Sequence, residues 1–322
     1  MASPLDRSVD RYSQAAERAV QWLLAQQNPD GSFVQPDLQA DVYHKGPFAL
    51  GISGSIAPAM RALNWIKAHD LQDNGRLRHF DAGLALYKTC WIAQGAHRLA
   101  RFDTSRPVMQ YILSCQAPCG GFFQVVEGND YIEPVCSAWA GMTAVYLGET
   151  AAAERAAEGM IAMLDQQPDE TRFYYWMTPE GRLATPEAPI LGSAPFVDAT
   201  QPQQAYYCSG IVMLFLTRMY LATGEERWLA GAQKLFDFSL RCADDAYAYP
   251  PSGKGSVAAA ILDTITGDPR ARAAACQFGD YLLQEQSLEG WWRNPQADNM
   301  IIRLDHTAEF IVWLNEIVGA LA

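Results

Sequence analysis

The segment Gln110-Tyr-Ile-Leu-Ser-Cys-Gln-Ala-Pro-Cys-Gly-Gly-Phe122 contains the pattern on which the fold prediction depends. Its first half places an aromatic and two aliphatic residues at helical spacing, so that they share one face of a helix. Its second half is a glutamine, a short turn with glycine, and an aromatic residue. The glycine allows the backbone to reverse, and the aromatic side chain then folds back over the helix end. The segment therefore predicts an amphipathic helix closed by a defined turn.

The same pattern recurs along the chain. Clear copies occupy Gln21–Phe33 and Asp280–Trp291, and looser copies occupy residues 64–77 and 159–173. A sequence pattern that recurs in this way indicates an array of similar structural units rather than an irregular globular fold.

Each of these helices is preceded by one of a different character, rich in Ala, Gly, Cys and aromatic residues. Such a composition is typical of a helix buried on nearly all sides. The predicted pairs are 43–54 with 55–69, 82–99 with 104–117, 134–148 with 150–166, 205–223 with 225–242, and 252–267 with 269–286. The first helix, 8–27, and the last, 304–320, are left over, and pairing them closes a ring. The sequence thus predicts an all-α, single-domain (α/α)6 toroid over residues 1–322.

Several junctions contain helix-boundary signals. Gly224 and Gly267 follow the ends of two buried helices, and Asp268-Pro269 and Thr104-Ser-Arg-Pro107 are typical helix starts. Residues 167–204 break the regularity with six prolines and several aromatics. A loop of this length in a compact domain is often a lid over a cavity, and a family-variable insertion is the alternative.

Composition limits the class of partner. The 322 residues are 49% hydrophobic and 19% charged, with a net charge of −12. An acidic chain without a basic stripe does not suit nucleic acid or an anionic membrane surface. The N-terminal segment has no apolar core of a signal peptide, and no window approaches the length of a membrane span. Seven dispersed cysteines suggest reduced thiols, so a cytoplasmic location is predicted.

The phrase Gln26-Gln-Asn-Pro-Asp-Gly-Ser-Phe33, with the paired helices, resembles the terpenoid cyclase and protein prenyltransferase superfamily of α/α toroids. The phrase is similar to the "QW" repeat of squalene and hopene cyclases. This resemblance implies a six-hairpin barrel with a central cavity at one end. Uronyl hydrolases, sugar epimerases and polysaccharide lyases share that architecture, so the resemblance indicates fold more strongly than function.

The starts of the buried helices carry unusual polar residues. In a parallel ring these starts gather at one mouth, and their second positions are His44, Lys88, Cys136, Cys208, Lys254 and His306. Three of the chain's five lysines fall here, counting Lys45. A cation at a helix N-terminus is unfavourable by roughly 0.3–1 kcal/mol and its pKa is lowered, which a functional role would explain. The alternative is an ion pair with a carboxylate at the rim.

These residues suggest acid–base chemistry at an anion-attracting mouth. The predicted catalytic residues are Lys88, Lys254, His306 and His44. The predicted substrate-binding residues are Lys45, Tyr43, Tyr87, Tyr207, Cys136, Cys208, Asp305 and Arg303. Alternative roles remain open for three of them: Asp305 as the N-cap of the last helix, and Cys136 or Cys208 as an activated thiolate or zinc ligand.

Missing motifs narrow the function further. We find no Asp-x-Asp-Asp, no Asp-Asp-x-x-Asp, no Rossmann fingerprint and no Gly-x-Ser-x-Gly. The sequence therefore predicts an enzyme that needs no cofactor or metal and acts on a small molecule with an anionic group. The preferred hypothesis is cyclisation, isomerisation or elimination on a terpenoid- or polyketide-like substrate. A carbohydrate-active enzyme, which requires paired carboxylates, and a non-catalytic toroid that binds a peptide or lipid are the alternatives. The candidate carboxylates are Asp41, Asp81, Glu133, Asp198 and Asp305.

Overall fold

A computed structural model describes residues 4–33, 43–78, 84–124, 131–187, 189–190, 193–294 and 298–322. Within these ranges the chain forms the helices expected from its sequence. They are α1 (Pro4–Ala25), α2 (Gly46–Ile52), α3 (Ile56–His69), α4 (Ala85–Arg98), α5 (Phe102–Ser114), α6 (Pro134–Leu147), α7 (Thr150–Asp165), α8 (Tyr207–Thr223), α9 (Glu226–Ser239), α10 (Gly253–Thr266), α11 (Pro269–Glu285) and α12 (Met300–Leu321).

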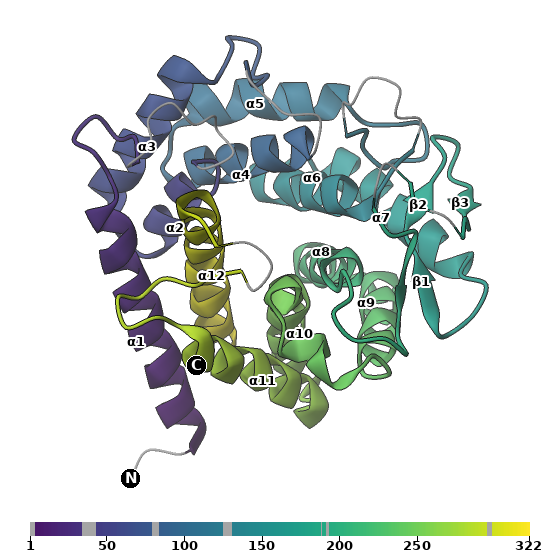
Figure 1. The fold of residues 1–322 in the computed structure, drawn as a ribbon. Helices are drawn as coiled ribbons and strands as arrows, with labels where there is room; N and C mark the ends of the chain where they lie inside the picture. Colours follow the sequence, from purple (N-terminus) through teal and green to yellow (C-terminus); the bar gives the residue numbers. More distant parts are fainter. Residues whose placement is uncertain are drawn as a thin grey trace. The chain divides into compact units, whose positions relative to one another are not determined.

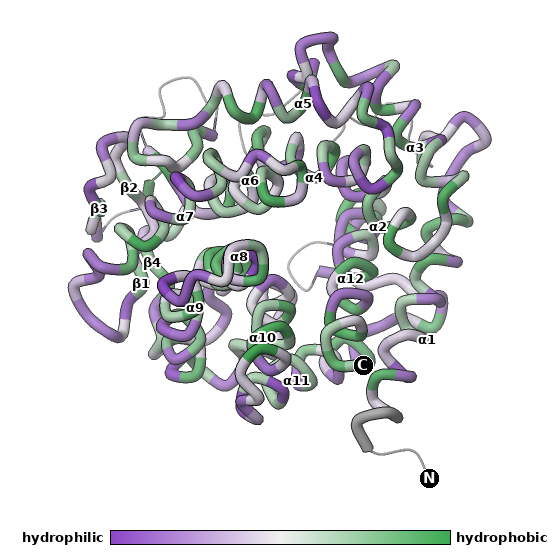
Figure 2. The backbone as a smooth tube through the Cα atoms, turned by 180° about the vertical axis from the view of Figure 1, so that it is seen from behind, coloured by the Kyte–Doolittle hydropathy of each residue, from purple (hydrophilic) through white to green (hydrophobic). Residues whose placement is uncertain are grey.

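The helices alternate between two characters, as the pattern predicts. The even-numbered helices are apolar around their circumference, and α6 is buried continuously from Pro134 to Ala144. Figure 2 shows α8 as mostly hydrophobic in the same way. The odd-numbered helices are amphipathic: α9 buries Trp228, Ala232, Leu235 and Phe236 along one face. The even-numbered helices therefore form the inner elements and the odd-numbered helices the outer ones.

Backbone contacts divide the chain into two compact units. Unit 1 comprises Met1–Asp81, Lys88–Tyr111 and Gly279–Ala322, and unit 2 comprises Ala82–Tyr87 and Ile112–Phe278. In unit 1, α1 lies beside α12, so the first and last helices pair as predicted (Figure 1). In unit 2, α8 packs against α6, α9 and α10.

One glutamine in each well-preserved repeat joins an outer helix to the next outer helix. Gln116 follows α5, and its Nε2 donates to the carbonyls of Gly120 and Ala152, both at 2.9 Å. Ala152 lies on α7, and Arg155 of the same helix donates to Gln116 Oε1. One side chain thus satisfies a turn carbonyl and a helix carbonyl and is itself held by an arginine. We call this arrangement the glutamine clamp.

The clamp recurs with the same spacing in unit 1. Gln27 binds the carbonyls of Gly31 and Pro58 and accepts from Arg61, while Gln286 binds Gly290 and Ala15 and accepts from Arg18. In each case the arginine follows the helix carbonyl by three residues, one turn of the helix. The repeat seen in the sequence is therefore a repeated contact between outer helices.

Steric contact with the next helix explains why glycine occupies the turn. Gly120 has φ +90°, and a Cβ placed on it would lie 2.0 Å from the carbonyl oxygen of Arg155. The chain reverses so closely against the next helix that no side chain fits. Phe122 then pairs with Gln116 in an antiparallel bridge and is fully buried. The expected fold-back of the aromatic residue is confirmed.

Two helix starts differ from the expectation. The helix α5 begins at Phe102, so Pro107 lies inside it rather than at its first turn. The N-cap of α12 is Asn299, whose Oδ1 accepts from the backbone N–H of Ile302 at 3.0 Å. Asp305 is therefore not the cap but a residue of the second turn. The left-handed glycines Gly224 and Gly267, with φ 72° and 70°, end α8 and α10 as predicted.

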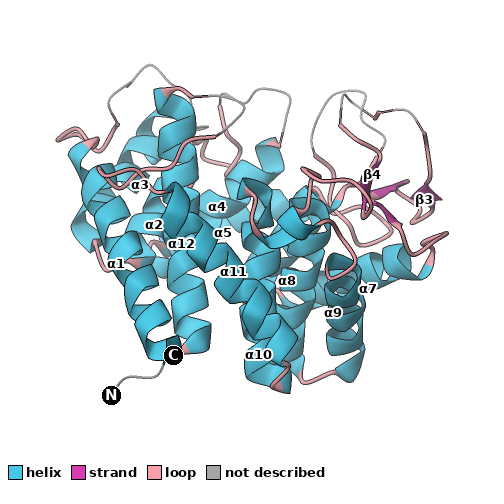
Figure 3. Cartoon of the chain, turned by 60° about the horizontal axis from the view of Figure 1, so that its bottom comes forward, coloured by secondary structure: helices cyan, strands magenta, loops and turns pink. Residues whose placement is uncertain are grey.

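Residues 167–204 are not a purely irregular loop. They contain β1 (Arg172–Tyr174) paired with β4 (Phe196–Asp198), and β2 (Trp176–Met177) paired with β3 (Leu183–Ala184), both antiparallel. These strands appear in magenta in Figure 3. Tyr175 is only 3% exposed. The segment is thus a packed β element on an otherwise helical unit 2, because its aromatic residues bury themselves there rather than facing solvent.

The clamp geometry predicts a large stability difference between two glycine substitutions in unit 2. Gly148, at the end of α6, has a similar φ of +83°, but no atom lies within 4 Å of a Cβ placed on it. We expect Gly148→Ala to cost about 1–2 kcal/mol, the penalty of a left-handed alanine. Gly120→Ala should cost about 4 kcal/mol or more, because the helix α7 must also move. Urea unfolding measures both values, and equal losses would contradict a steric role for the turn.

Candidate functional site

Charged residues of unit 1 meet where the chain enters α2 and in the first turns of α12. Lys45 Nζ lies 2.8 Å from the carboxylate of Asp305 and 2.5 Å from Glu309 Oε2. His44 Nε2 lies 3.8 Å from Asp305 Oδ1. Asp305, His306 and Glu309 follow one another on α12, and the first and last are one turn apart. We call these five residues the Lys45 cluster.

Lys45 is a buried cation held by two anions. Lys45 is 4% exposed, whereas the side chains of Asp305 and Glu309 are 24% and 16% exposed. Burial opposes the charge of Lys45, but Asp305 and Glu309 outweigh it and raise the pKa of the ammonium above its ordinary value. Burial likewise opposes ionisation of Asp305, but Lys45 and then His44 leave the pKa of that carboxyl below its usual value. Lys45 and Asp305 therefore both keep their charges at neutral pH.

His306 differs from its neighbours because it is poised to exchange a proton. Its ring packs against Phe310, with 5.4 Å between the ring centroids. Its Nδ1 is buried and has no hydrogen-bond partner among the residues described. Burial lowers the pKa of the imidazole below 6.5, and the charge of Asp305 and a hydrogen bond to the backbone of Arg293 limit that fall. At neutral pH the ring is uncharged and lies beside two carboxyl groups.

A second group of polar side chains occupies the N-terminal ends of three inner helices in unit 2. Glu133 precedes α6, Tyr207 and Cys208 begin α8, and Lys254 is the second residue of α10. The hydroxyls of Tyr175 and Tyr207 are hydrogen-bonded neighbours of the Cys208 thiol. We call these five residues the Cys208 cluster.

Glu133 caps α6. Its carboxylate accepts from the backbone N–H groups of Val135 at 2.6 Å and Cys136 at 2.7 Å, and from Gln124 Nε2 at 3.3 Å. Burial raises the pKa of Glu133, and these hydrogen bonds limit the rise. Burial of the Cys208 thiol raises its pKa well above the ordinary value, and the carboxyl group of Glu133 adds to this increase. Cys208 is therefore a protonated thiol at neutral pH, which argues against the activated thiolate.

Aromatic rings surround the lysine of this cluster. Lys254 Nζ lies 5.3 Å from the centroid of the Tyr87 ring, and Tyr87 packs against Trp139 at 5.6 Å. An ammonium in this position is attracted to the electron-rich ring face. Lys254 and Tyr87 are only 6% exposed, so both belong to the interior of unit 2.

The structure brings the predicted residues together in two sets. One set is His44, Lys45, Asp305 and His306 in unit 1, and the other is Tyr87, Tyr207, Cys208 and Lys254 in unit 2. Lys88 is half-buried in the first turn of α4, and Cys136 is fully buried in the first turn of α6. A single ring of all six helix starts spans both units and stays a prediction.

Two of the predicted substrate-binding residues, Tyr43 and Arg303, are engaged in contacts with neighbouring side chains. Tyr43 is 1% exposed and packs between Phe33, at 5.4 Å, and Trp65, at 4.5 Å, so its ring lies in the core of unit 1. The guanidinium of Arg303 donates to both oxygens of Asp298, at 2.7 and 2.8 Å, and also stacks on a ring at 3.9 Å. That ring is Trp291, and Arg303 thus links α12 to the segment before it.

Sequence reasoning missed two members of the clusters. Glu309 lies four residues after Asp305 on α12, and this spacing alone predicts a shared helix face. Tyr175 reaches Cys208 from the link between β1 and β2, and no spacing in the sequence indicates this contact. Of the proposed carboxylates, Asp41 and Asp81 lie outside the described residues. Asp198 binds Thr200 at a turn, at 2.9 and 2.6 Å.

In the part of the chain that the structure describes, no group of three or more His, Cys, Asp and Glu side chains could hold a metal ion. None of the helices in those ranges combines the length and apolarity needed to cross a membrane.

No protein-family model matches the chain, and no curated protein matches its sequence. Solved structures do match its fold. A D-mannose isomerase aligns with a TM-score of 0.72 and 10% identity, covering 96% of this chain and 97% of that one. The GH76A α-1,6-mannanase from Salegentibacter sp. HEL1_6 aligns at 0.67 and 12%, covering 97% and 100%.

A third solved structure is a variant of the type II terpene cyclase MstE from Scytonema with geranylgeranyl dihydroxybenzoate. It aligns with a TM-score of 0.63 and 12% identity, covering 98% of this chain and 99% of that one. The similarities extend over nearly the whole length of each protein. They show that the chain has the α/α toroid fold, shared with terpene cyclases and with sugar-processing enzymes, as its repeats predict.

The Lys45 cluster predicts a strong and pH-dependent stability effect. Lys45→Met leaves Asp305 and Glu309 without their buried counter-charge, so we expect a loss of about 3–5 kcal/mol at pH 7. The lowered pKa of Asp305 stabilises the fold above pH 3.8, and this contribution disappears as the pH falls through the folded-state value. The difference between variant and parent should therefore persist down to pH 3.8 and shrink only below it. Urea unfolding at pH 7 and at a series of pH values on both sides of 3.8 tests this.

A matched control is the exposed pair Lys67–Asp103, whose side chains are 43% and 50% exposed. Lys67→Met removes the same charge from a solvent-screened ion pair and should cost at most about 1 kcal/mol. If both substitutions cost the same, burial of the Lys45 ion pair has no energetic role.

Proposed function

We propose that this chain is an enzyme that moves protons on a small organic molecule, in a reaction of the isomerase, cyclase or lyase type. The observation that carries the proposal is His306, a largely buried imidazole with a lowered pKa that lies on α12 beside the carboxylates of Asp305 and Glu309. The solved structures with this fold that act on mannose, mannan or an isoprenoid support the enzyme class. The chemistry requires only side chains of this chain.

His306 would act as the general base. Its imidazole accepts a proton from a carbon or hydroxyl of the substrate, and the resulting imidazolium lies beside Asp305 and Glu309, which stabilise its positive charge. Lys45 holds both carboxylates in place and keeps that of Asp305 ionised. The imidazolium then returns the proton to a neighbouring atom, which completes an isomerisation or eliminates a leaving group. General acid–base catalysis of this kind contributes roughly 10²–10⁴-fold in rate.

The character of the Lys45 cluster favours an oxygen-rich substrate. It presents carboxyl groups and imidazoles. Such groups bind hydroxyl and carboxyl oxygens rather than hydrocarbon. We therefore favour a sugar or hydroxy acid with an anionic group over an unsubstituted isoprenoid.

A terpenoid- or polyketide-like substrate is the second candidate. It is favoured by Lys254, whose Nζ lies over the Tyr87 ring, and by the tilted contact of that ring with Trp139. Ring faces that attract an ammonium also stabilise the carbocations of a cyclisation.

Deuterium exchange tests the reaction class without knowledge of the product. The protein is incubated in D₂O with separate panels of aldoses, ketoses, uronic acids and polyprenyl compounds, and proton NMR follows loss of a C–H signal. Proton transfer at carbon predicts exchange or conversion in the hydroxylated panels. Conversion only of polyprenyl compounds supports the second candidate, and no reaction with any panel contradicts the proposal.

His306→Gln should lower kcat on the substrate so identified by about 10²–10⁴-fold with a nearly unchanged melting temperature, because only the proton acceptor is lost. His97→Gln is the matched control. His97 also has its pKa lowered by burial, but it lies in the last turn of α4 against Phe102, away from both clusters. If both variants retain activity, or His306→Gln simply unfolds, His306 is structural.

The pH profile gives an independent test. Since burial places the pKa of His306 below 6.5, the imidazole is in its basic form throughout the neutral range. We expect kcat/KM to be level near pH 7 and to fall as the pH drops through a value below 6.5. A rate that rises on acidification would reverse the role and make His306 an acid.

A further inference from the structure

A small cavity in unit 2 lies where α8 packs against α9 and α10 (Figure 1). The 3₁₀ helices η1 (Asp244–Tyr247) and η2 (Pro250–Ser252) contribute to its lining. Its volume is about 20 Å³. One water molecule needs roughly 10–15 Å³, whereas sites for organic ligands begin near 300 Å³. The polar side chains that line the cavity are those of Tyr206, Ser209, Ser239, Cys242, Tyr247 and Ser252.

Five of these six side chains already donate their hydrogen to an acceptor of the protein. Three of the donations run from Tyr206 to Asp245 Oδ1 at 2.6 Å, from Ser209 to the carbonyl of Tyr206 at 3.2 Å, and from Cys242 to the carbonyl of Phe238 at 3.5 Å. Ser239 donates to the carbonyl of Phe236 at 2.6 Å. Because a serine has one hydroxyl hydrogen, the 2.6 Å bond between Ser239 and Tyr247 is donated by the tyrosine.

Ser252 is the exception in this lining. It is 2% exposed, and its Oγ is buried without a hydrogen-bond partner among the described residues. A serine directly before a helix usually caps it, but η2 runs straight into α10. Ser252 therefore has helical angles, φ −81° and ψ −9°, and its side chain makes no capping bond. A buried hydroxyl without a partner destabilises the folded state, because it has given up its bonds to bulk water.

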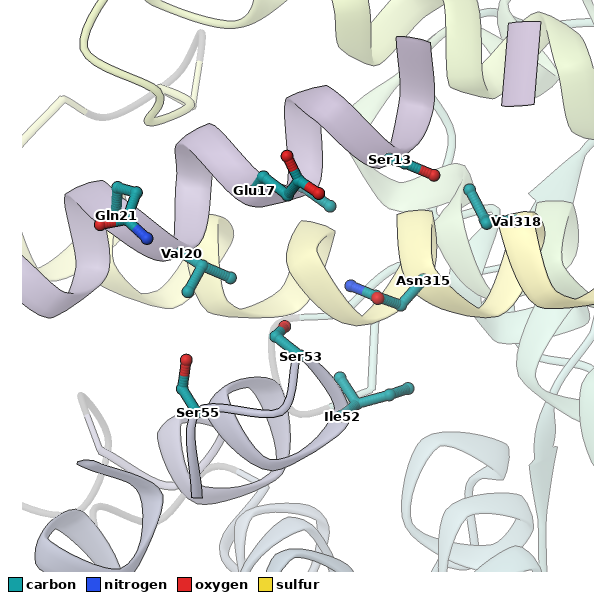
Figure 4. Close-up of a pocket in the computed structure, with 10 residues that line it drawn as sticks. Ser13, Glu17, Val20, Gln21, Ile52, Ser53, Ser55, Asn315 and Val318 are labelled. Atoms are coloured by element: carbon teal, nitrogen blue, oxygen red, sulfur yellow. The ribbon is translucent and has the colours of Figure 1, made fainter. Parts of the chain in front are cut away.

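The cavity of unit 1 shown in Figure 4 lacks this feature. It has a volume of about 340 Å³ between α1, the turn after α2, and α12. None of its polar lining side chains is buried, and these are Ser13, Glu17, Gln21, Ser53, Ser55 and Asn315. Solvent satisfies their hydrogen bonds, so that cavity indicates no particular ligand.

We propose that the cavity of unit 2 binds one water molecule, which bridges the start of α10 to α8 and η1. The water accepts the hydrogen of Ser252 and donates its own two hydrogens to the oxygens of Ser209 and Tyr247. Each of those oxygens has given its hydrogen away but keeps lone pairs. A buried water typically makes about three hydrogen bonds, and this set supplies three. Water fits because it both donates and accepts, and a larger polar molecule exceeds the volume.

A high-resolution crystal structure of the full chain tests the occupancy directly. We expect one solvent peak at roughly 2.7–2.8 Å from Ser252 Oγ, the ordinary distance between two hydroxyl-type oxygens. The same peak should be absent or displaced in crystals of Ser252→Ala. A cavity without solvent density, or a Ser252 hydroxyl bonded directly to a protein acceptor, would overturn the proposal.

The stability of Ser252→Ala gives an independent test, because the two possibilities have opposite signs. If the hydroxyl binds a water, its removal costs a hydrogen bond, and the folding equilibrium constant should fall by about tenfold. If the hydroxyl has no partner, alanine removes the penalty of burying it, and the constant should stay the same or rise. Urea unfolding measures this change.

Ser13→Ala is the matched control. Ser13 is half-buried on α1 and donates to the carbonyl of Val9 at 3.1 Å, so solvent replaces the bond that the substitution removes. Its folding constant should stay within about twofold of the parent. An equal loss in both variants would show a general effect of removing a serine hydroxyl and contradict the water bridge. Neither measurement involves a substrate, so both outcomes are independent of the enzymatic proposal.

Discussion

The contact on which the architecture depends is the glutamine clamp between successive outer helices. A helix end leaves carbonyl groups without partners, and a turn that reverses the chain adds another. The amide of Gln116 satisfies the carbonyl of Gly120 and reaches the adjacent helix in one step, and Arg155 holds its oxygen. Each clamp therefore fixes where the next outer helix begins relative to the previous one.

The N-terminal ends of the inner helices are where this protein places polar groups that a helical core alone would not select. The inner helices are buried around their circumference, so a charged residue on them must be neutralised or hydrogen-bonded. The two units solve this differently. Unit 1 buries Lys45 against Asp305 and Glu309, whereas unit 2 places Glu133 on two backbone N–H groups and Lys254 over the ring of Tyr87.

Neighbouring groups therefore have different roles: some keep a fixed charge, and one can exchange a proton. Lys45 and Asp305 keep their charges at neutral pH, because each raises the cost of neutralising the other. His306, beside them, has its charge suppressed by burial and so remains able to accept a proton. Groups with fixed charge next to a group that titrates are typical of sites for proton transfer. In unit 2 the same burial makes Cys208 a neutral thiol rather than a nucleophile.

The sequence by itself determined the helices, their alternation and the position of the turns. Periodicity and the Gln, Gly and aromatic signals are local, so the glycine at 120 and the caps at 224 and 267 could be read directly. It also marked His44, Lys45, Asp305 and His306 as unusual. Only the tertiary structure decided which of these residues meet, that Asn299 rather than Asp305 caps α12, and that Tyr175 reaches Cys208. Those contacts join residues far apart in the chain, and their energies depend on burial, which no local pattern encodes.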